Sequence, residues 1–515
     1  MENLTQPITH LWRLLNWGRT LARHGALQGI ERDPLTPPSV RRLVRVARFG
    51  LKMPTTPDYA AALQAIGPAA IKLGQALATR PDLVGEVAAK NLIQLQDSLP
   101  PVAFAQIRKA IEKGLEAPIE SLFQSIDEVP VGAASIAQVH RAVTTEGRVV
   151  AVKVLRPGIE DEFARALETY EWAAAHVETL GGEAERLRPR LIVAHFKQWT
   201  RRELDLQREA ASASELKEKM VAEPDFYVPE IDWSRSARRV MTLEWIDGIK
   251  LTRRDELIAA GHQPKALAAI LIRAFLRQAV VDGFFHADLH QGNLFALPDG
   301  RLAAIDFGIM GRIDRRARLW LAEILYGLIT GNYQRVAEIH FEAQYVPSHH
   351  NVAEFATALR AVGEPIRGLP VKSISVGRML ESLFSITRDF DMQTQPHLLL
   401  LQKTMVMEEG VATALDPDIN MWEAAEPFLR EWIRGELGPE AIAADALVDL
   451  VRTAKLIPDL IKRIDTAFPP AGAAPPPPPL ASVAVIRRPP LLGYALVALL
   501  AAAAGAAAVL LLGLG

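Results

Sequence analysis

The chain has 515 residues, of which 49% are hydrophobic, with a formal net charge of −2 and a pI of about 6.7. This length and composition allow two to four domains with a large core and exclude a disordered protein, while the lack of a basic excess argues against nucleic acid as a partner. The chain contains no cysteine, which excludes disulfides, thiolate metal sites, iron–sulfur clusters and cysteine nucleophiles.

The first hundred residues are predicted to be helical. In residues 1–50, Leu and Trp are interspersed with several Arg. This pattern is typical of an amphipathic helix that either packs on a domain or lies on a membrane surface. The start of the chain lacks the apolar segment and cleavage site of a signal peptide, so most of the protein is expected to stay where it is made. Tyr59–Gln96 is Ala- and Leu-rich, with an interruption at Gly67-Pro68. It contains Lys72-Leu73-Gly74-Gln75. From helical periodicity alone, Lys72 and Gln75 are expected to lie on a solvated face.

A β-branched run at Val149–Leu155 is bounded by turn signals and is predicted to be a strand. Its Val-Ala-Val-Lys places Lys153 as the kinase lysine, whose ammonium reaches the α- and β-phosphates of the nucleotide. A loop of small residues precedes this strand, and such a loop lets backbone amides approach phosphates closely. The residues of this loop expected to bind nucleotide are Gly132, Ala133, Ala134, Ser135, Ile136, Ala137, Gln138 and Val139.

Residues 190–216 are predicted to form one helix that carries three carboxylates. Glu203 falls on its apolar stripe, whereas Asp205 and Glu209 share another face. A carboxylate on an apolar stripe is costly without a partner. Glu209 is therefore expected to pair with Lys153, and Glu203 and Asp205 are expected to face another cation or a metal. A solvated, Glu-rich helix face is the alternative.

A strand over residues 239–248 ends where a kinase hinge would hold the adenine and ribose, and Glu244, Ile246 and Asp247 are its candidate contacts. Helical segments at 264–282 then lead to the strongest motif of the chain, His286–Phe295, which Asp306-Phe307-Gly308 follows.

Three side chains of this motif carry the predicted chemistry. Asn293 lies five positions after Asp288, and Asp306 lies eighteen positions after it, which is the spacing of a kinase catalytic loop and its metal-binding aspartate. Phosphoryl transfer needs a carboxylate that orients or deprotonates the incoming hydroxyl or water, and oxygen ligands that hold Mg²⁺ on the phosphates. Asp288 is predicted to be the base, and Asn293 and Asp306 are predicted to be the magnesium ligands.

The C-terminal residues 491–515 contain no charged side chain, and this run is long enough for one membrane helix. Arg487 and Arg488 precede it, so the positive-inside bias places the folded part in the cytoplasm. A Pro-rich stretch between Phe468 and Pro479 is typical of an extended spacer. The sequence therefore predicts a single-pass anchor in the cytoplasmic (inner) membrane.

Together these motifs resemble the UbiB family of atypical kinase-like ATPases, which support ubiquinone biosynthesis. Lys72-Leu73-Gly74-Gln75 is similar to the family's Lys-x-Gly-Gln element, Gly132–His140 to its Ala-rich nucleotide loop, and Glu203-Leu204-Asp205 to its Glu-x-Asp element. The resemblance implies that the Lys-x-Gly-Gln helices fold across the site where a protein substrate would dock and meet the Glu-x-Asp carboxylates there. By this analogy, Lys72 and Gln75 become site residues.

The resemblance implies ATP and Mg²⁺ as cofactors and slow ATP hydrolysis rather than vigorous protein phosphorylation. The implied partners are isoprenoid quinone precursors or another membrane lipid, ubiquinone-biosynthesis enzymes and the membrane, with a homodimer as an option. Two alternatives stay open: a small-molecule kinase of the aminoglycoside or choline type, and a catalytically silent nucleotide- or lipid-binding scaffold.

The expected fold is α+β and protein-kinase-like, with two lobes, a mostly helical C-lobe and a C-terminal transmembrane helix. The predicted parts are a helical extension at 1–115, an N-lobe at 116–250, a C-lobe at 251–467, a linker at 468–490 and the anchor at 491–515.

Overall fold

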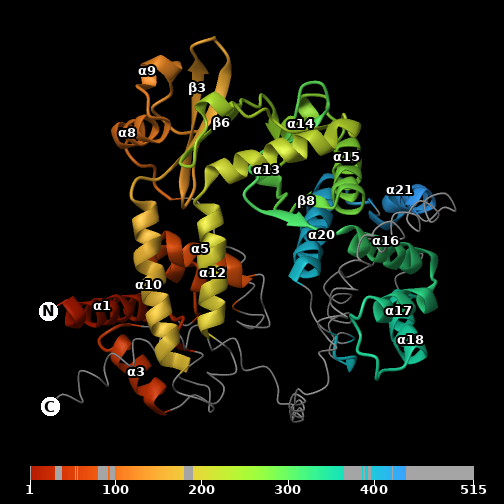
Figure 1. The fold of residues 1–515 in the computed structure, drawn as a ribbon, viewed down its shortest axis with the longest axis horizontal. Helices are drawn as coiled ribbons and strands as arrows, with labels where there is room; N and C mark the ends of the chain where they lie inside the picture. The colour runs from red at the N-terminus through yellow and green to blue at the C-terminus, as the bar shows by residue number, and fades with distance from the viewer. Residues whose placement is uncertain are drawn as a thin grey trace, which may run out of the picture. The chain divides into compact units, whose positions relative to one another are not determined.

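The computed structural model describes residues 2–28, 38–78 apart from 53 and 55, 99–178, 189–364, 396–419 and 421–436, with a few positions between these ranges. They form two compact units. One holds residues 2–214 and Glu230–Trp245, and the other holds Glu215–Pro229 and the described residues between 246 and 436. The described residues contain both helices and strands, as the α+β prediction requires (Figure 1). The predicted linker and anchor lie outside the described residues, and within those residues no helix is long and apolar enough to cross a membrane.

The first unit contains an antiparallel sheet in the order β1-β3-β4-β6, with β2 paired to β3. The predicted lysine strand is confirmed as β4, and its Val150, Val152 and Val154 are buried against Ile107 and Ile111 of α8. Figure 1 shows α8 and α9 beside this sheet. The elements are α8 (Phe104–Leu115), α9 (Ile119–Leu122), β1 (Phe123–Ile126), β2 (Gly132–Ala133), β3 (Ala137–Thr144), β4 (Val149–Leu155) and β6 (Val240–Glu244).

Among the remaining helices of this unit, α10 contacts α1, α5 and α12, while α3 packs on α1 and α4 packs on α1 and α5. Aromatic rings contribute to this packing, since Trp17 of α1 lies 5.2 Å from Tyr170 of α10 between ring centroids. The predicted interruption at Gly67-Pro68 separates α4 from α5. The bounds are α1 (Glu2–Arg23), α3 (Pro38–Arg48), α4 (Tyr59–Ile66), α5 (Pro68–Ala78), α10 (Ile159–Glu178) and α12 (Pro189–Glu203).

The prediction of one helix over 190–216 is wrong, because the chain ends α12 at Glu203 and begins α13 (Leu206–Lys219) after a break. At the break, the Asp205 carboxylate accepts a hydrogen bond of 3.2 Å from the Arg208 N–H. An aspartate in this position satisfies a free amide at the start of a helix and so favours a new helix over continuation of the old one. Asp205 and Glu209 therefore do not share a face of one continuous helix.

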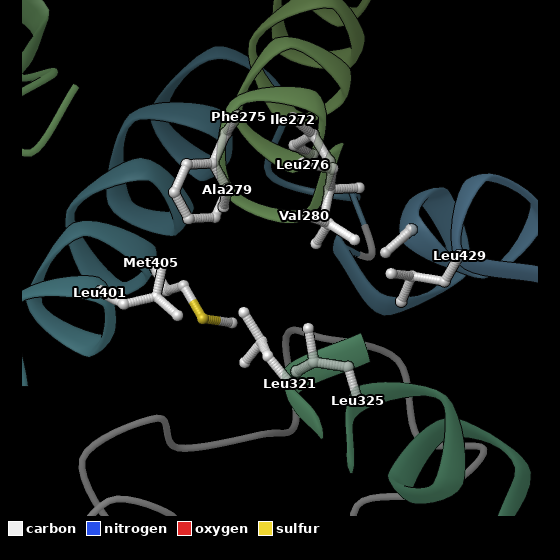
Figure 2. Close-up of a pocket in the computed structure, with 11 residues that line it drawn as sticks. Ile272, Phe275, Leu276, Ala279, Val280, Leu321, Leu325, Leu401, Met405 and Leu429 are labelled. Carbon is white, nitrogen blue, oxygen red and sulfur yellow. The ribbon is translucent and has the colours of Figure 1, made fainter. Parts of the chain in front are cut away.

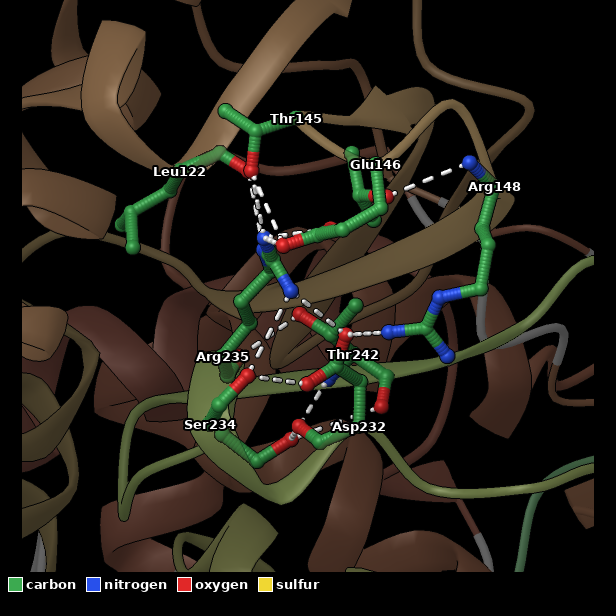
Figure 3. Close-up of polar contacts among 10 residues, drawn as sticks. Leu122, Thr145, Glu146, Arg148, Asp232, Ser234, Arg235 and Thr242 are labelled. Atoms are coloured by element: carbon green, nitrogen blue, oxygen red, sulfur yellow. Dashed lines mark hydrogen bonds and ion pairs between the residues drawn. The ribbon is translucent and has the colours of Figure 1, made fainter.

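A polar network surrounds the buried guanidinium of Arg235, which belongs to the 3₁₀ turn η2 (Trp233–Arg235) beside the sheet (Figure 3). Arg235 donates to Asp232 at 2.9 Å and to the Glu146 carboxylate at 2.7 and 2.8 Å. Arg148 donates to the same Asp232 carboxylate at 2.7 Å. The hydrogen bond from Arg235 lowers the pKa of Glu146 to about 2. This network ties the β3–β4 turn to the segment that enters β6.

The second unit contains two small sheets. One has the order β5-β10-β9-β7, and the other pairs β8 with β11. β5 comes from the separate segment Glu215–Pro229, and it pairs in parallel with β10. The strands are β5 (Phe226–Tyr227), β7 (Ile249–Lys250), β8 (Phe284–His286), β9 (Leu294–Ala296), β10 (Leu302–Ala304) and β11 (Met310–Arg312).

Several helices of the second unit line a small apolar cavity, into which Phe275, Leu401, Met405 and their neighbours point (Figure 2). The predicted helical segment 264–282 is confirmed, although its last six residues, η3 (Arg277–Asp282), form a π-helix. The other bounds are α14 (Arg254–Ala259), α15 (Pro264–Leu276), α16 (Arg315–Thr330), α17 (Tyr333–Glu342), α18 (Val352–Gly363), α20 (Pro396–Leu415) and α21 (Met421–Glu436).

Candidate active site

In the first unit, the predicted pair of Lys153 and Glu209 is present. The Lys153 ammonium of β4 donates to a Glu209 carboxylate oxygen of α13 at 2.6 Å, and their side chains are 15% and 7% exposed. Such a buried pair holds both charges in place, because breaking it would leave one charge in a poorly solvated environment. The ammonium is thus fixed at a defined point of the sheet.

A second ion pair joins the Lys-x-Gly-Gln and Glu-x-Asp elements. Lys72 Nζ of α5 lies 3.4 Å from Glu203 Oε2 at the end of α12, and both side chains are 10% exposed or less. The periodicity of α5 suggested a solvated face for Lys72, and that interpretation is wrong because the side chain is buried. Gln75, one turn later, is half-buried. The pair provides the partner that a carboxylate on an apolar stripe requires.

The glycine of this element has a packing role. A Cβ on Gly74 would collide with the side chains of Leu63 in α4 and Leu95. Only a residue without a side chain lets α5 approach α4 this closely. Gly74 therefore contributes to the close packing of α5 on α4.

The Ala-rich loop is a tight hairpin between β2 and β3, with Gly132 opposite Val139 and Ala133 opposite Gln138. Arg156 fixes the hairpin, since its guanidinium donates to the Ala134 carbonyl at 2.8 Å, and the Arg156 N–H donates to the Ile136 carbonyl at 2.9 Å.

The side chains of this hairpin differ in how accessible they are. Gly132 is exposed, and a Cβ there would meet open space. Ser135 and Gln138 are fully buried. Gln138 is bound to the backbone of Val102, whose N–H donates to its Oε1 at 2.6 Å. The Gln138 amide therefore has a structural role, while a nucleotide contact of this loop stays a prediction.

The hinge candidates lie where the chain passes from the first unit to the second, between Trp245 and Ile246. Glu244 ends β6, and its carboxylate accepts the Glu230 N–H at 3.2 Å. Asp247 is exposed and Ile246 is half-buried. The structure thus gives Glu244 a local structural contact, while a nucleotide contact of these three residues stays a prediction.

In the second unit, the catalytic loop runs from β8 to β9 through the 3₁₀ turn η4 (Gln291–Asn293). The Asn293 side-chain amide donates to the Asp288 carbonyl at 3.2 Å, which leaves its Oδ1 available. Asp306 is exposed and has a φ of 68°, and its Oδ1 accepts the Gly308 N–H at 3.2 Å. A non-glycine residue at positive φ is uncommon and is typical of functional turns.

His286 connects the two halves of this motif, and the sequence analysis gave it no role. The Asp288 N–H donates to His286 Nδ1 at 3.1 Å, so the proton of the neutral ring is on Nε2, which donates to the Asp306 carbonyl. The ring is 1% exposed and packs edge-on against Phe307. Burial lowers the pKa of His286 and keeps it neutral. Its position two residues before Asp288 was the available signal.

Lys403 is a further residue that the motifs did not reveal. Its ammonium, from α20, lies 3.5 Å from Asp288 Oδ1, and the two side chains are 31% and 30% exposed. The next residue, Thr404, is fully buried, and its hydroxyl lies 3.5 Å from the Ala287 carbonyl. Helix α20 thus brings a cation to the predicted catalytic carboxylate from more than a hundred positions further along the chain.

Comparison with known proteins gives two consecutive family matches. Residues 94–340 match the ABC1 atypical kinase-like domain, and residues 359–420, which include Lys403, match the UbiB helical domain. The chain is 41% identical over 385 residues to "Probable protein kinase UbiB" of Marinobacter nauticus, covering 74% of this chain and 70% of that protein.

Among solved structures, the complex of Rv3197 with erythromycin from Mycobacterium tuberculosis aligns with a TM-score of 0.48 and 24% identity, covering 70% of this chain and 91% of that one. The family matches confirm the predicted kinase-like character of the fold. The chain belongs to the UbiB family of ABC1 atypical kinase-like enzymes.

Proposed function

We propose that this protein binds ATP with Mg²⁺ and hydrolyses it slowly at the cytoplasmic face of a membrane, in support of ubiquinone biosynthesis. The observation that carries the proposal is the catalytic loop. His286 holds the backbone of Asp288 and of Asp306 through its two ring nitrogens, so the predicted base and the predicted metal ligand belong to one preorganised element. Such preorganisation is what phosphoryl transfer demands of a protein.

The magnesium ligands fit the ion by their chemistry. Asn293 Oδ1 and the exposed Asp306 carboxylate are hard oxygen donors, which Mg²⁺ prefers. Magnesium would neutralise negative charge on the phosphate oxygens. The Lys153 ammonium, held by Glu209, would bind the α- and β-phosphates, and Asp288 would orient the attacking water or hydroxyl.

Lys403 would be a positioning residue for this reaction. Its ammonium lies against one oxygen of the Asp288 carboxylate, which restricts the rotation of that carboxylate and leaves its second oxygen for the attacking group. Its positive charge is also favourable beside a phosphoryl group in transfer.

Membrane contact is supported by a surface on α1 and α3. Ile8, Trp12 and Leu15 follow each other at helical spacing on α1 and are 63%, 64% and 37% exposed, while Phe49, just after α3, is 81% exposed. The opposite side of α1 is buried, with Leu14 against Ala173 of α10. The helix thus packs on the domain and also presents a second apolar stripe. The exposed arginines of α3, Arg42 and Arg45, add the charge that anionic lipids attract.

ATP hydrolysis tests the proposal. Phosphate release would be measured with Mg²⁺, with and without anionic liposomes and a phenolic quinone-precursor analogue. Wild type should turn over slowly and respond to lipid or phenol, and Asp288→Asn and Asp306→Asn should abolish turnover. Asp299→Asn is the matched control, because this exposed carboxylate pairs only locally with Arg301. Nucleotide binding without phosphate release under every condition would instead favour the silent scaffold.

The α1–α3 surface has its own test. Vesicle flotation would compare the full chain, a chain lacking residues 491–515, and that shorter chain with Trp12→Glu or Phe49→Glu. The substitutions should reduce binding at least ~10-fold, because each removes roughly 2 kcal/mol of apolar burial. Val221→Glu, at an apolar side chain that is 79% exposed outside this surface, should have no such effect. Equal binding of all shortened variants would contradict the membrane role of α1 and α3.

A further inference from the structure

A group of metal-ligating side chains lies in the second unit, outside the catalytic loop. Within the part of the chain that the structure describes, His349, His350 and Asp391 form the one group of three such residues whose ligand atoms all lie within 4.8 Å of one another. The two histidines belong to the turn between α17 and α18, and Asp391 lies before α20.

The ligand atoms converge on a common point. His350 Nε2 lies 3.4 Å and His349 Nε2 lies 3.8 Å from the same oxygen, Asp391 Oδ2. Two imidazoles and one carboxylate around a tetrahedral Zn²⁺ place their ligand atoms about 3.3–3.5 Å apart, given bonds of roughly 2.0–2.2 Å. The two histidine–aspartate distances lie near this range, and all three ligand atoms lie within 4.8 Å of one another.

The protein contacts leave this arrangement incomplete. His350 Nε2 is inaccessible to solvent and has no hydrogen-bond partner among the residues that the structure describes. A buried polar atom without a partner is costly and calls for an explanation. The two imidazole rings lie close together, with centroids 4.1 Å apart and planes tilted by 37°. A cation shared by the two imidazoles and the Asp391 carboxylate would give this nitrogen a partner.

The cluster is fixed by the packing beneath it. Phe390 lies against the His350 ring at 5.3 Å and against Phe355 of α18 at 4.9 Å between centroids. Phe355 is fully buried, so Phe390 anchors the segment that carries Asp391. Asp391 has a φ of 47°, a conformation that Asp tolerates better than most residues. The site is therefore partly preformed.

We propose that His349, His350 and Asp391 bind a divalent transition-metal ion, with Zn²⁺ as the best match to two imidazoles and a carboxylate. The side chains of His349 and Asp391 are 65% and 46% exposed, so an ion reaches them from solvent and water completes the coordination. Binding joins the α17–α18 turn to the segment before α20. Closing a long stretch of chain in this way stabilises the folded state.

Metal titration of the full-length chain, stripped with EDTA and free of nucleotide, tests the site. Competition of Zn²⁺ with a chromophoric chelator should give one equivalent per chain, and Co²⁺ should give the visible absorption of a tetrahedral site. Asp391→Asn, which keeps the shape of the side chain, and His349→Ala should each weaken Zn²⁺ at least ~10-fold. Zn²⁺ should also raise the Tm of wild type but not of these variants.

His195→Ala is the matched control, since His195 is an exposed histidine on α12 outside the cluster, and it should bind Zn²⁺ as wild type does. Equal Zn²⁺ affinity of wild type, Asp391→Asn and His349→Ala would overturn the site and assign the binding to scattered histidines. The absence of any binding by wild type would overturn it as well. No readout involves ATP, so the result is independent of the proposed function.

Discussion

Replacing Lys403 by Met tests whether α20 contributes to catalysis. The 3.5 Å separation of its ammonium from Asp288 Oδ1 corresponds to about 1 kcal/mol of attraction at the dielectric constant of water and about 5 kcal/mol at an effective value of 20. Both side chains are about one-third exposed, so solvent screening places the effect toward the lower end. Lys403→Met should therefore lower kcat by roughly 10- to 100-fold and reduce the free energy of unfolding by less than ~1 kcal/mol.

Steady-state ATP hydrolysis and urea unfolding measure the two effects of this substitution. Lys403→Arg keeps the positive charge and should retain most of kcat. Lys265→Met, at an exposed lysine of α15, should leave kcat unchanged. The reasoning would be refuted if Lys403→Met kept kcat within twofold of wild type, or if its loss of activity simply followed a loss of folded protein.

Three further substitutions test the packing and electrostatics of the fold. Glu209→Gln should lower the free energy of unfolding by about 3 kcal/mol in urea, because it leaves the Lys153 ammonium buried without its partner. Glu171→Gln, which removes one member of a half-exposed ion pair, should lower it by less than ~1 kcal/mol. Equal losses for the two variants would contradict the role of burial. Burial raises the pKa of Glu408 well above its ordinary 4.5, so the folded state binds this proton more tightly, and wild-type stability should fall as pH rises above 4.5, by up to about 1.4 kcal/mol per pH unit. Glu408→Gln should lack this pH dependence of stability. The prediction would be refuted if the Tm of wild type and of Glu408→Gln changed equally between pH 5 and 8. Gly74→Ala should lower the free energy of unfolding by about 1–3 kcal/mol through overpacking, whereas Gly410→Ala, with nothing within 4 Å of its Cβ, should raise it slightly in the same urea titration.

The sequence predicted those parts of the site that depend on local spacing. The strand of Lys153 and the pair that it forms with Glu209 could be predicted because a β-branched run and one carboxylate-rich segment suffice to place them. The break at Asp205 was missed because an apolar stripe continues across it, while the competing cap is a single side-chain hydrogen bond. Periodicity cannot distinguish these two outcomes.

Residues that reach the site through tertiary contacts could not be predicted in the same way. Lys403 lies on a helix whose sequence carries no sign of the Asp288 contact, since that contact depends on how α20 packs beside the catalytic loop. The burial of Lys72 likewise depends on tertiary packing, in which its ammonium meets Glu203 of α12. Only the resemblance to the family, and not the pattern of the helix, gave Lys72 a role before the structure did.

The way the chain alternates between the two units has a consequence for protein synthesis. The described residues of the first unit have all been made once Trp245 has been added, but β5 at Phe226–Tyr227 pairs with β10, which follows some seventy-five residues later. During translation, β5 therefore stays unpaired until β10 has been made. Until then Phe226, which is 4% exposed in the folded protein, is accessible to other strands. A fragment ending at Trp245 would retain this unpaired strand permanently, so such a truncation should aggregate unless residues 215–229 are also replaced by a short polar linker.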